Sequence, residues 1–256
     1  MSALSGRTVV VTRPHTAPDS LVAALRRSGA HALCCPLTEL RQADDLSDLD
    51  AELAGPKRPD WVVFTSAAAV DVVCDHTRKS GAVFPAGTRI AAVGPATAQA
   101  LERHGLTADA MPADHRGAAF GASLGPLSHL RVLLPRSDIG REETVAALRG
   151  AGAEVVPVTV YHTMPVRPAA SHLALLRGAM DAITFMAPSA VRSFAALLSD
   201  DAVSVLKATT VACIGPTTAA EVRGLGVSRP LTAPAGDTNA LVALLERHFA
   251  ASRRPA

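Results

Sequence analysis

The sequence predicts an α/β protein of two related domains, each with a parallel sheet. Short apolar runs rich in β-branched residues, such as Thr8–Thr12, are typical of strands buried on both faces, and helical patterns follow them. One such strand and helix, TVACIGPTTAAEVRGLG over Thr210–Gly226, recurs as RIAAVGPATAQALERHG over Arg89–Gly105, with Gly215 lying 121 positions after Gly94. The repetition indicates an internally duplicated chain.

Two further segments repeat. DWVVFTSAAAV from Asp60 matches DAITFMAPSAV from Asp181, again 121 positions later, and the segment from Thr8 resembles the one from Arg131, 123 positions later. The 256 residues are enough for two ordinary domains. Two copies of about 120 residues indicate paired domains and not a solenoid.

Composition excludes several classes of function. A net charge of +2, with six Phe, one Trp and one Tyr, does not suit a nucleic-acid partner. The four cysteines lack CxxC spacing, so we expect reduced core residues of a cytoplasmic protein. No metal-ligand motif, membrane span or signal-peptide pattern occurs, and the missing glycine fingerprints argue against a nucleotide enzyme.

The first strand, Thr8–Thr12, leads to Arg13 at its carboxyl end, where open α/β sheets bind ligands. Arg13 suits either an anionic ligand or a structural contact that covers a helix end. Thr16 and Asp19 resemble a capping box for a helix over Ala17–Ser28.

An extended connector is predicted for Ala32–Leu40 and a solvated helix for Asp44–Glu52. The strand Trp61–Phe64 follows, and Ser66 is a natural N-cap for a helix over Ala67–Cys74.

The repeat of this junction differs, because Ala187 cannot cap a helix by its side chain, although Pro188 suits a first helical position and Ser189 follows.

Arg131–Pro135 is predicted as a buried strand whose carboxyl-end loop holds Arg136, Ser137, Asp138, Gly140 and Arg141. Two arginines and a glycine in one loop suit an anion. A helix over Glu142–Arg149 and an extended segment over Glu154–Tyr161 follow, and Asn239–Phe249 closes the chain as an amphipathic helix.

The junction at Gly215 favours an anion as well. Glycine lets the backbone approach a ligand, and Pro216 fits a first helical position. Thr217 and Thr218 add hydroxyls where unpaired N–H groups and the helix dipole attract negative charge. We expect a carboxylate or phosphate there, although many such junctions bind nothing.

In order, the segments VVVTRP, CPLTEL, FTSAAAV, AAVGPATAQAL, LLPRSDIGRE, GAEVVPVTVYHT, ITFMAPSAV and ACIGPTTAAEV resemble uroporphyrinogen-III synthases over nearly the whole chain. The resemblance implies two flavodoxin-like α/β domains joined by two extended linkers, with the ligand cleft between them. The implied domains are residues 1–35 with 166–256, and 42–158; the linkers are 36–41 and 159–165. Bisecting the repeat would have divided the chain elsewhere.

The resemblance also implies the reaction, without cofactor or metal. The substrate is hydroxymethylbilane, a linear tetrapyrrole with carboxylates on every ring. Loss of its hydroxyl gives an azafulvene, ring D attacks to form a spiro intermediate, and reopening and closure invert ring D. We further expect a cytoplasmic monomer that transiently contacts hydroxymethylbilane synthase, with no nucleic-acid or membrane partner.

By the resemblance, Tyr161 in VYHT is the acid that helps the hydroxyl leave, or else a packed linker tyrosine. The expected substrate-binding residues are Thr12, Arg13, Ser66, Arg136, Ser137, Gly140, Arg141, Ala187, Ser189, Gly215, Thr217 and Thr218. Ala187 departs from the serine common in the family, so Ser189 or backbone N–H groups must replace one hydroxyl.

Three alternatives stay open: an inactive homologue that senses tetrapyrroles or another anion, a periplasmic-type binding protein, and a phosphate-ester or nucleotide enzyme. Retained Tyr161 and the two threonines favour the synthase over the sensor.

Overall fold

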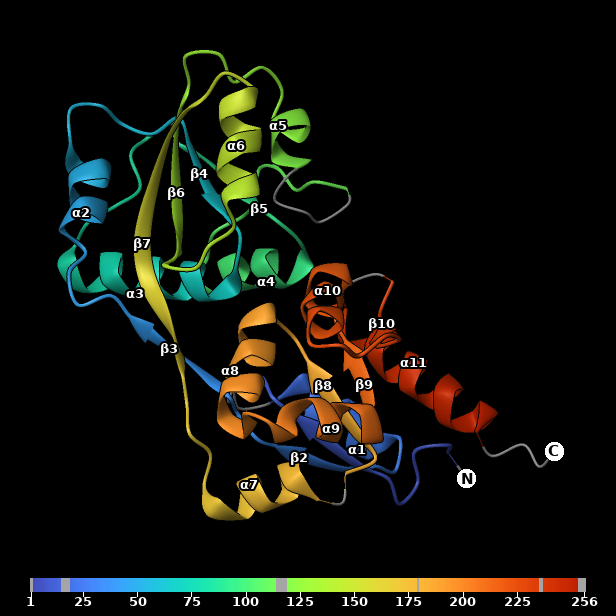
Figure 1. Cartoon of the computed structure of the whole chain (residues 1–256). Coiled ribbons are helices and arrows are strands. Elements are labelled where there is room, and N and C mark those ends of the chain that lie inside the picture. Colours follow the sequence, from blue (N-terminus) through green and yellow to red (C-terminus); the bar gives the residue numbers. More distant parts are fainter. Residues whose placement is uncertain (1, 15–18, 114–118, 179, 235–236, 253–256) are drawn as a thin grey trace. The chain divides into compact units, whose positions relative to one another are not determined.

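The structure is a computed structural model that describes residues 2–14, 19–113, 119–178, 180–234 and 237–252. The chain forms two compact units (Figure 1). Unit 1 consists of Met1–Glu39 and Met164–Ala256, and unit 2 of Leu40–Thr163. The two division points fall within the segments expected to be linkers, 36–41 and 159–165.

Unit 1 contains a five-stranded sheet in the order β10-β9-β8-β1-β2, with every pair parallel. Its strands are β1 (Thr8–Val11), β2 (His31–Cys34), β8 (Ala182–Phe185), β9 (Thr210–Cys213) and β10 (Leu231–Thr232). Numbered within the unit, this order is 2-1-3-4-5, the flavodoxin-like arrangement, in which ligands bind at the carboxyl ends of the strands on either side of the switch point. Here that point lies between β1 and β8.

Helices cover both faces of this sheet. On one face, α1 (Ser20–Arg27) and α11 (Thr238–Ala251) pack Leu21, Leu25, Leu241 and Leu245 over Val9 and Val11. The other face is covered by α7 (Ala170–Arg177), α8 (Pro188–Leu198), α9 (Asp201–Ala208) and α10 (Pro216–Gly224). Two covered faces explain why the strands read as continuous apolar runs.

Unit 2 has a sheet in the order β3-β7-β6-β4-β5. Its strands are β3 (Thr38–Gln42), β4 (Trp61–Phe64), β5 (Arg89–Ala92), β6 (Arg131–Ser137) and β7 (Glu154–Pro165). One face is covered by α2 (Ser47–Ala54), α3 (Ala67–Ser80) and α4 (Pro95–Arg103), and the other by α5 (Phe120–Ser123) and α6 (Glu142–Gly150).

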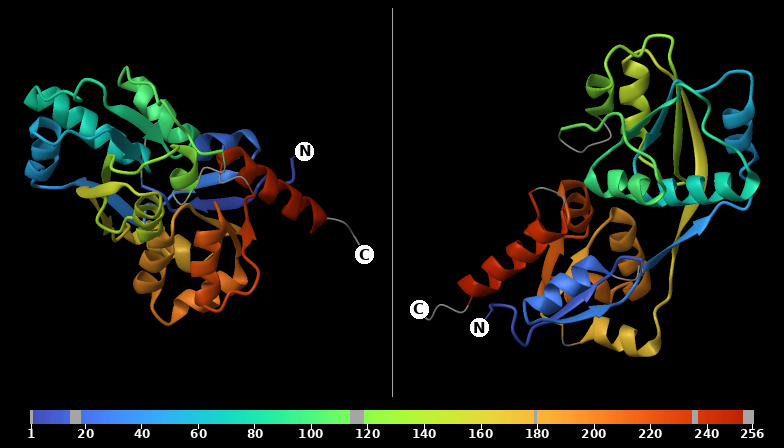
Figure 2. Two further views of the ribbon diagram at one scale, coloured as in Figure 1. Left: turned by 90° about the horizontal axis from the view of Figure 1, so that it is seen from above. Right: turned by 180° about the vertical axis from the view of Figure 1, so that it is seen from behind.

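The two connecting segments pair with each other. Ala43 N–H donates to the Val160 carbonyl at 3.0 Å, and Val166 N–H donates to the Leu37 carbonyl at 3.0 Å. From Leu37 to Ala43 the residue number rises, while it falls from Val166 to Val160 on the partner segment. The two segments, and with them β3 and β7, therefore run antiparallel. Figure 2 shows both segments from two further sides.

The repeat is visible in the topology. The matching strands β9 and β5, β8 and β4, β1 and β6, and β2 and β7 occupy the same places in the two sheets. Each unit thus holds one copy of every repeated segment, but unit 1 begins with β1-α1-β2 whereas unit 2 ends with β6-α6-β7.

The aspartates that begin two of the repeated strands join neighbouring strands at their amino ends. The Asp181 carboxylate accepts the Thr8 N–H at 2.8 Å, while the Asp181 N–H donates to the Thr8 carbonyl at 2.9 Å. Asp60 makes the same two bonds to Arg131, at 2.7 and 2.9 Å. These repeated aspartates therefore have a structural role.

Several predicted elements need correction. Ala32–Leu40 is not a bare connector, because β2 ends the first sheet and β3 begins before Leu40. The predicted solvated helix is α2, which buries Leu49 and Leu53. Asp19 is itself the N-cap of α1, and Thr16 lies outside the described residues.

Two helices are longer than predicted: α3 runs on to Ser80, and α11 spans Thr238–Ala251 with Asp237 as its N-cap. No helix in the described ranges is long and apolar enough to cross a bilayer.

Candidate functional site

Tyr161 lies in β7 at the carboxyl end of the unit 2 sheet. It is 8% exposed and packs in the core cluster on the α3 side of the sheet. Its phenol oxygen lies 3.1 Å from Oγ of Ser66. Ser66 Oγ also accepts the Ala69 N–H at 3.1 Å and so caps α3, as its position after β4 predicted. The phenol is therefore attached to the start of a helix.

A β-bulge determines which way Tyr161 points. Pairing between β6 and β7 runs regularly to Arg136 and Thr159, then shifts so that Ser137 faces Tyr161. Along β7, exposed Thr159 is followed by two buried residues, Val160 and Tyr161. Regular alternation would have placed Tyr161 on the same face as Thr159. The extra residue instead turns the phenol into the unit.

Asp138, just after β6, organises the turn beside Tyr161. Its carboxylate accepts hydrogen bonds from the Ser137 hydroxyl at 2.8 Å and from the N–H groups of Ile139 and Thr163 at 3.0 and 3.1 Å. His162 Nδ1 lies 3.2 Å from its other oxygen. Burial opposes the charge, but these donors outweigh it and lower the pKa of Asp138.

Burial raises the pKa of the Tyr161 phenol, and the negative charge of Asp138 adds to the increase, while hydrogen bonds with Ser66 and Ser137 partly oppose it. Tyr161 is therefore a neutral phenol at physiological pH, able to donate a proton.

Arg136 and Ser137 belong to β6 and not, as predicted, to the loop after it. The Arg136 guanidinium donates to the Gly140 carbonyl and, at 2.7 Å, to Glu142. A Cβ on Gly140 would meet this guanidinium, so glycine here makes room for Arg136. Arg141 is the exposed N-cap of α6 and forms no side-chain cap bond.

At the carboxyl edge of unit 1, Thr12 directly follows β1 with its side chain turned into the protein. Thr12 is fully buried, and its hydroxyl donates to the Thr184 carbonyl at 2.8 Å, joining β1 to β8. Arg13 forms a two-pronged ion pair with Asp19, with Nε 2.7 Å from Oδ2. The helix-end role of Arg13 is thus the one that the geometry provides.

The α10 junction has Gly215 as N-cap and Pro216 at the first helical position. Its two threonines, predicted to act together, point apart: Thr217 is exposed, whereas Thr218 is 2% exposed and faces the core. A Cβ on Gly215 would meet nothing within 4 Å, and its φ of −172° suits any residue. Neither packing nor conformation requires glycine there.

Ala187 is the N-cap of α8 without a side-chain bond, and half-buried Ser189 lies in the first turn of that helix. Unit 1 thus presents two helix starts, α8 and α10, at the carboxyl edge of its sheet.

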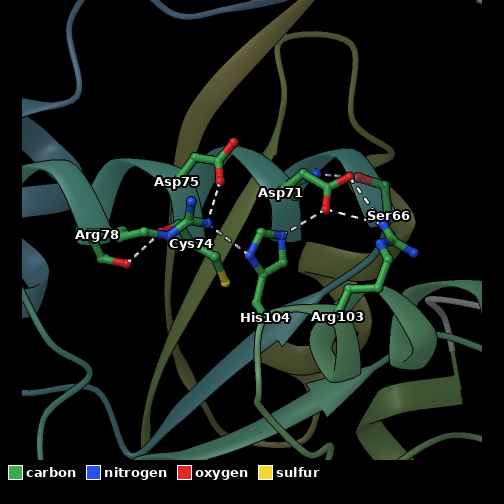
Figure 3. Close-up of polar contacts among 9 residues, drawn as sticks. Ser66, Asp71, Cys74, Asp75, Arg78, Arg103 and His104 are labelled. Carbon is green, nitrogen blue, oxygen red and sulfur yellow. Dashed lines mark hydrogen bonds and ion pairs between the residues drawn. The ribbon is translucent and has the colours of Figure 1, made fainter. Parts of the chain in front are cut away.

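Sequence reasoning missed the polar network between α3 and α4 (Figure 3). Asp71 accepts from His104 Nε2 at 2.9 Å and from Arg103 at 3.2 Å, and His104 Nδ1 lies 3.2 Å from Arg78. Asp71 and Arg78 lie on α3, the helix that Ser66 begins, whereas Arg103 and His104 lie at the end of α4. Their spacing on two helices gave no sequence signal. The network fixes α3 against α4 and so supports the helix that carries Ser66.

The cysteines do not suit nucleophilic chemistry. Cys35, Cys74 and Cys213 are buried and free, and burial raises the pKa of their thiols to about 11, 11 and 12. In the part of the chain that is described, no three His, Cys, Asp or Glu side chains are grouped to hold a metal ion.

Comparison with known proteins adds the family. The model of the family described as uroporphyrinogen-III synthase HemD matches residues 19–243. The uroporphyrinogen-III synthase of Synechococcus elongatus is 30% identical over 226 residues, 84% of this chain and 85% of the relative. The corresponding protein of Chlorobaculum parvum is 25% identical, over 86% of this chain and 90% of its own.

Solved structures agree in fold. A crystal structure of a mutant uroporphyrinogen III synthase from Thermus thermophilus has a TM-score of 0.65 and 20% identity, and covers 98% of this chain and 100% of its own. The uroporphyrinogen-III synthetase of Helicobacter pylori has a TM-score of 0.63 and 19% identity, covering 97% and 100%. Because the family model matches most of this chain, the chain belongs to the uroporphyrinogen-III synthase family, lyases that cyclise hydroxymethylbilane in tetrapyrrole biosynthesis.

Proposed function

We propose that this chain converts hydroxymethylbilane to uroporphyrinogen III, with Tyr161 as the acid for the leaving hydroxyl. The observation that carries the assignment of Tyr161 is its neutral phenol, held 3.1 Å from the helix-capping Ser66 at the carboxyl edge of a parallel sheet.

In this mechanism Tyr161 gives its proton to the terminal hydroxyl as the carbon–oxygen bond breaks and water leaves. The resulting azafulvene is attacked by the substituted carbon of ring D, and the spiro intermediate reopens and closes with ring D inverted. Unaided closure gives the type I isomer. The main task of the protein is therefore to hold the bilane in the conformation that leads to the spiro intermediate.

We assign binding of the substrate carboxylates to helix starts. Gly215 and Thr217 at α10, Ser189 beside Ala187 at α8, and Arg141 at α6 offer N–H groups, hydroxyls and one cation. Backbone N–H groups at helix N-termini bind anions without a large net charge.

The remaining assignments carry less of the binding. Thr12 and Thr218 are buried and support the strand and helix behind the site. Arg13 and Arg136 already hold Asp19 and Glu142, and would bind a carboxylate by exchanging these partners.

We also propose a cytoplasmic monomer that receives its substrate in a transient contact with hydroxymethylbilane synthase. Buried, free thiols suit a reducing compartment. Gel filtration, alone and with that enzyme, would measure both states of association.

A coupled assay tests the activity. Hydroxymethylbilane is generated from porphobilinogen, the protein is added, and the oxidised products are separated into type I and type III uroporphyrins. Type III product is expected. Type I alone, from folded protein, would contradict the proposal and favour an anion-sensing homologue.

The variant Tyr161→Phe tests the acid, and we expect turnover to fall several-fold or more. Thr159→Ala is the matched control, because Thr159 is exposed on the same strand just before the bulge. Unchanged turnover in Tyr161→Phe would remove the phenol from the mechanism.

A further inference from the structure

Asp138 binds the β7 backbone just after Tyr161, at the two peptide groups that flank His162. Its N–H donates to the Tyr161 carbonyl at 3.1 Å, and its carboxylate accepts the Thr163 N–H at 3.1 Å. One residue of the β6–α6 turn thus fixes the peptide groups on either side of His162.

These bonds lie where the regular pairing between β6 and β7 ends. Ser137 opposite Tyr161 is the last pair between β6 and β7, and it follows the bulge. The Asp138 N–H bond to the Tyr161 carbonyl belongs to this last pair, and beyond it the Asp138 carboxylate accepts the Thr163 N–H. The Ser137 hydroxyl completes the attachment: it donates to Asp138 at 2.8 Å and lies 3.1 Å from the Thr163 hydroxyl.

The charged groups around the phenol leave the Asp138 carboxylate as the one that acts on it. Arg136 on β6 is turned towards Gly140 and Glu142. On β7, His162 pairs with Asp138 itself. On α3, Asp71 is occupied by Arg103 and His104. Burial is the largest cause of the raised pKa of Tyr161, and the Asp138 charge adds to it, so loss of this charge should lower the pKa.

We propose that Asp138 is a positioning residue for Tyr161: its backbone and carboxylate hold the bulged end of β7 so that the phenol meets Ser66. The inference rests on the proposed role of Tyr161 as the acid. Asp138 acts through Tyr161 and need not touch the substrate.

Two substitutions distinguish the hydrogen bonds of the Asp138 side chain from its negative charge. In Asp138→Asn the amide oxygen still accepts the Thr163 and Ile139 N–H groups, but the negative charge is lost. In Asp138→Ala the carboxylate bonds are lost as well. Glu102→Gln, at an exposed residue of α4, is the control for removing one negative charge from unit 2.

The phenol can be titrated directly, because Tyr161 is the only tyrosine in the chain. The rise of tyrosinate absorbance with pH then reports one residue. We expect the pKa of Tyr161 to be lower in Asp138→Asn than in the unmodified protein, and unchanged in Glu102→Gln. An unshifted titration in Asp138→Asn would overturn the electrostatic part of the proposal.

Turnover tests whether the Asp138 side chain positions Tyr161. Asp138→Ala is expected to lower kcat by about tenfold or more with a small change in KM, because misplacing a reacting group by about 1 Å costs up to 10²-fold. Asp138→Asn should retain kcat within a few-fold. Equal kcat in Asp138→Ala and the unmodified protein would overturn the proposal, and so would an equal loss in both variants.

The two proposals fail separately. If the unmodified protein makes no type III product, the assigned activity is wrong, but the phenol titration needs no substrate and still shows whether Asp138 acts on Tyr161.

Discussion

The phenol oxygen of Tyr161 lies 3.1 Å from Oγ of Ser66, and the same Oγ accepts the Ala69 N–H in the first turn of α3 at 3.1 Å. One hydroxyl therefore serves both a helix cap and the candidate acid. A change at Ser66 should alter stability and phenol chemistry together.

Ser66→Ala is expected to lower the free energy of unfolding by about 1 kcal/mol through the lost cap. It should also raise the pKa of Tyr161, since the Ser66 hydrogen bond lowers it. Urea unfolding and tyrosinate absorbance measure the two effects. Asp237→Ala is the control, because Asp237 caps α11 through the Ala240 N–H and lies far in sequence from Tyr161. If the pKa of Tyr161 were the same in Ser66→Ala and Asp237→Ala, the Ser66 hydroxyl would have no influence on the phenol.

Ala187→Ser supplies the cap that α8 lacks. The backbone of Ala187 is already extended, at φ −156° and ψ 154°, nearly the same as at Ser66, at φ −156° and ψ 150°. A serine there can reach an N–H of the first turn, and we expect the midpoint of urea unfolding to rise, with activity intact or substrate affinity improved. A large loss of activity would show that the Ala187 loop is wrongly assigned to the site.

Gly215→Ala should fold normally but bind substrate more weakly. The added methyl meets no protein atom within 4 Å, so its cost falls on a ligand that approaches the backbone N–H groups of α10. Gly224→Ala, at the other end of α10 and equally open, is the control. We expect KM to rise about tenfold only in Gly215→Ala. The melting temperature should fall slightly in Gly215→Ala, because alanine caps a helix less well than glycine, and rise slightly in Gly224→Ala, because alanine favours the helix. An unchanged KM would take Gly215 out of the site.

The stability of the protein should fall in acid, partly through Asp181. Burial opposes its charge, but hydrogen bonds from the Thr8 N–H and Arg7 outweigh it and lower the pKa of this carboxyl below 3.8. Between the folded and unfolded pKa values the unfolded chain binds more protons. The stabilisation is therefore complete above about pH 4 to 5 and is lost as the pH falls through the folded pKa.

Asp181→Asn tests this dependence. It should lower the free energy of unfolding at pH 7 and reduce its decrease towards pH 3, measured by urea unfolding at both values. Ser204→Ala, at an exposed site of the same unit, is the control. If Asp181→Asn lost stability in acid as steeply as the unmodified protein, the Arg7 and Thr8 contacts would not be the cause.

Much of the fold could be predicted from local pattern. The strands at Thr8, Trp61, Arg131, Ala182 and Thr210 are short apolar runs with helices after them, and the structure confirms each strand. Burial on both faces leaves that signature in the sequence itself. The edge strands β2 and β3 were missed as strands because Pro36 between them resembles a loop and their residues are largely exposed.

Less of the candidate site could be predicted from the sequence. Ser66 was recognised as a cap, but its contact with Tyr161 joins residues 95 positions apart. Thr12 and Thr218 looked like ligand groups and are buried, since a hydroxyl near a strand end can point into the protein as readily as outward. Arg13 and Arg136 suggested free cations, but Asp19 and Glu142 lie within reach of them.

By itself, the sequence determined the fold class, the duplication, the helix starts at Ser66 and Gly215, and the resemblance to the family, because each of these depends on neighbouring residues or on their order. Only the tertiary structure decided which copy of each repeat joins which sheet, and that a bulge turns Tyr161 inward towards Ser66 with Asp138 beside it. Strand pairing and register depend on contacts between distant segments, and a shift of one residue reverses the direction of a side chain.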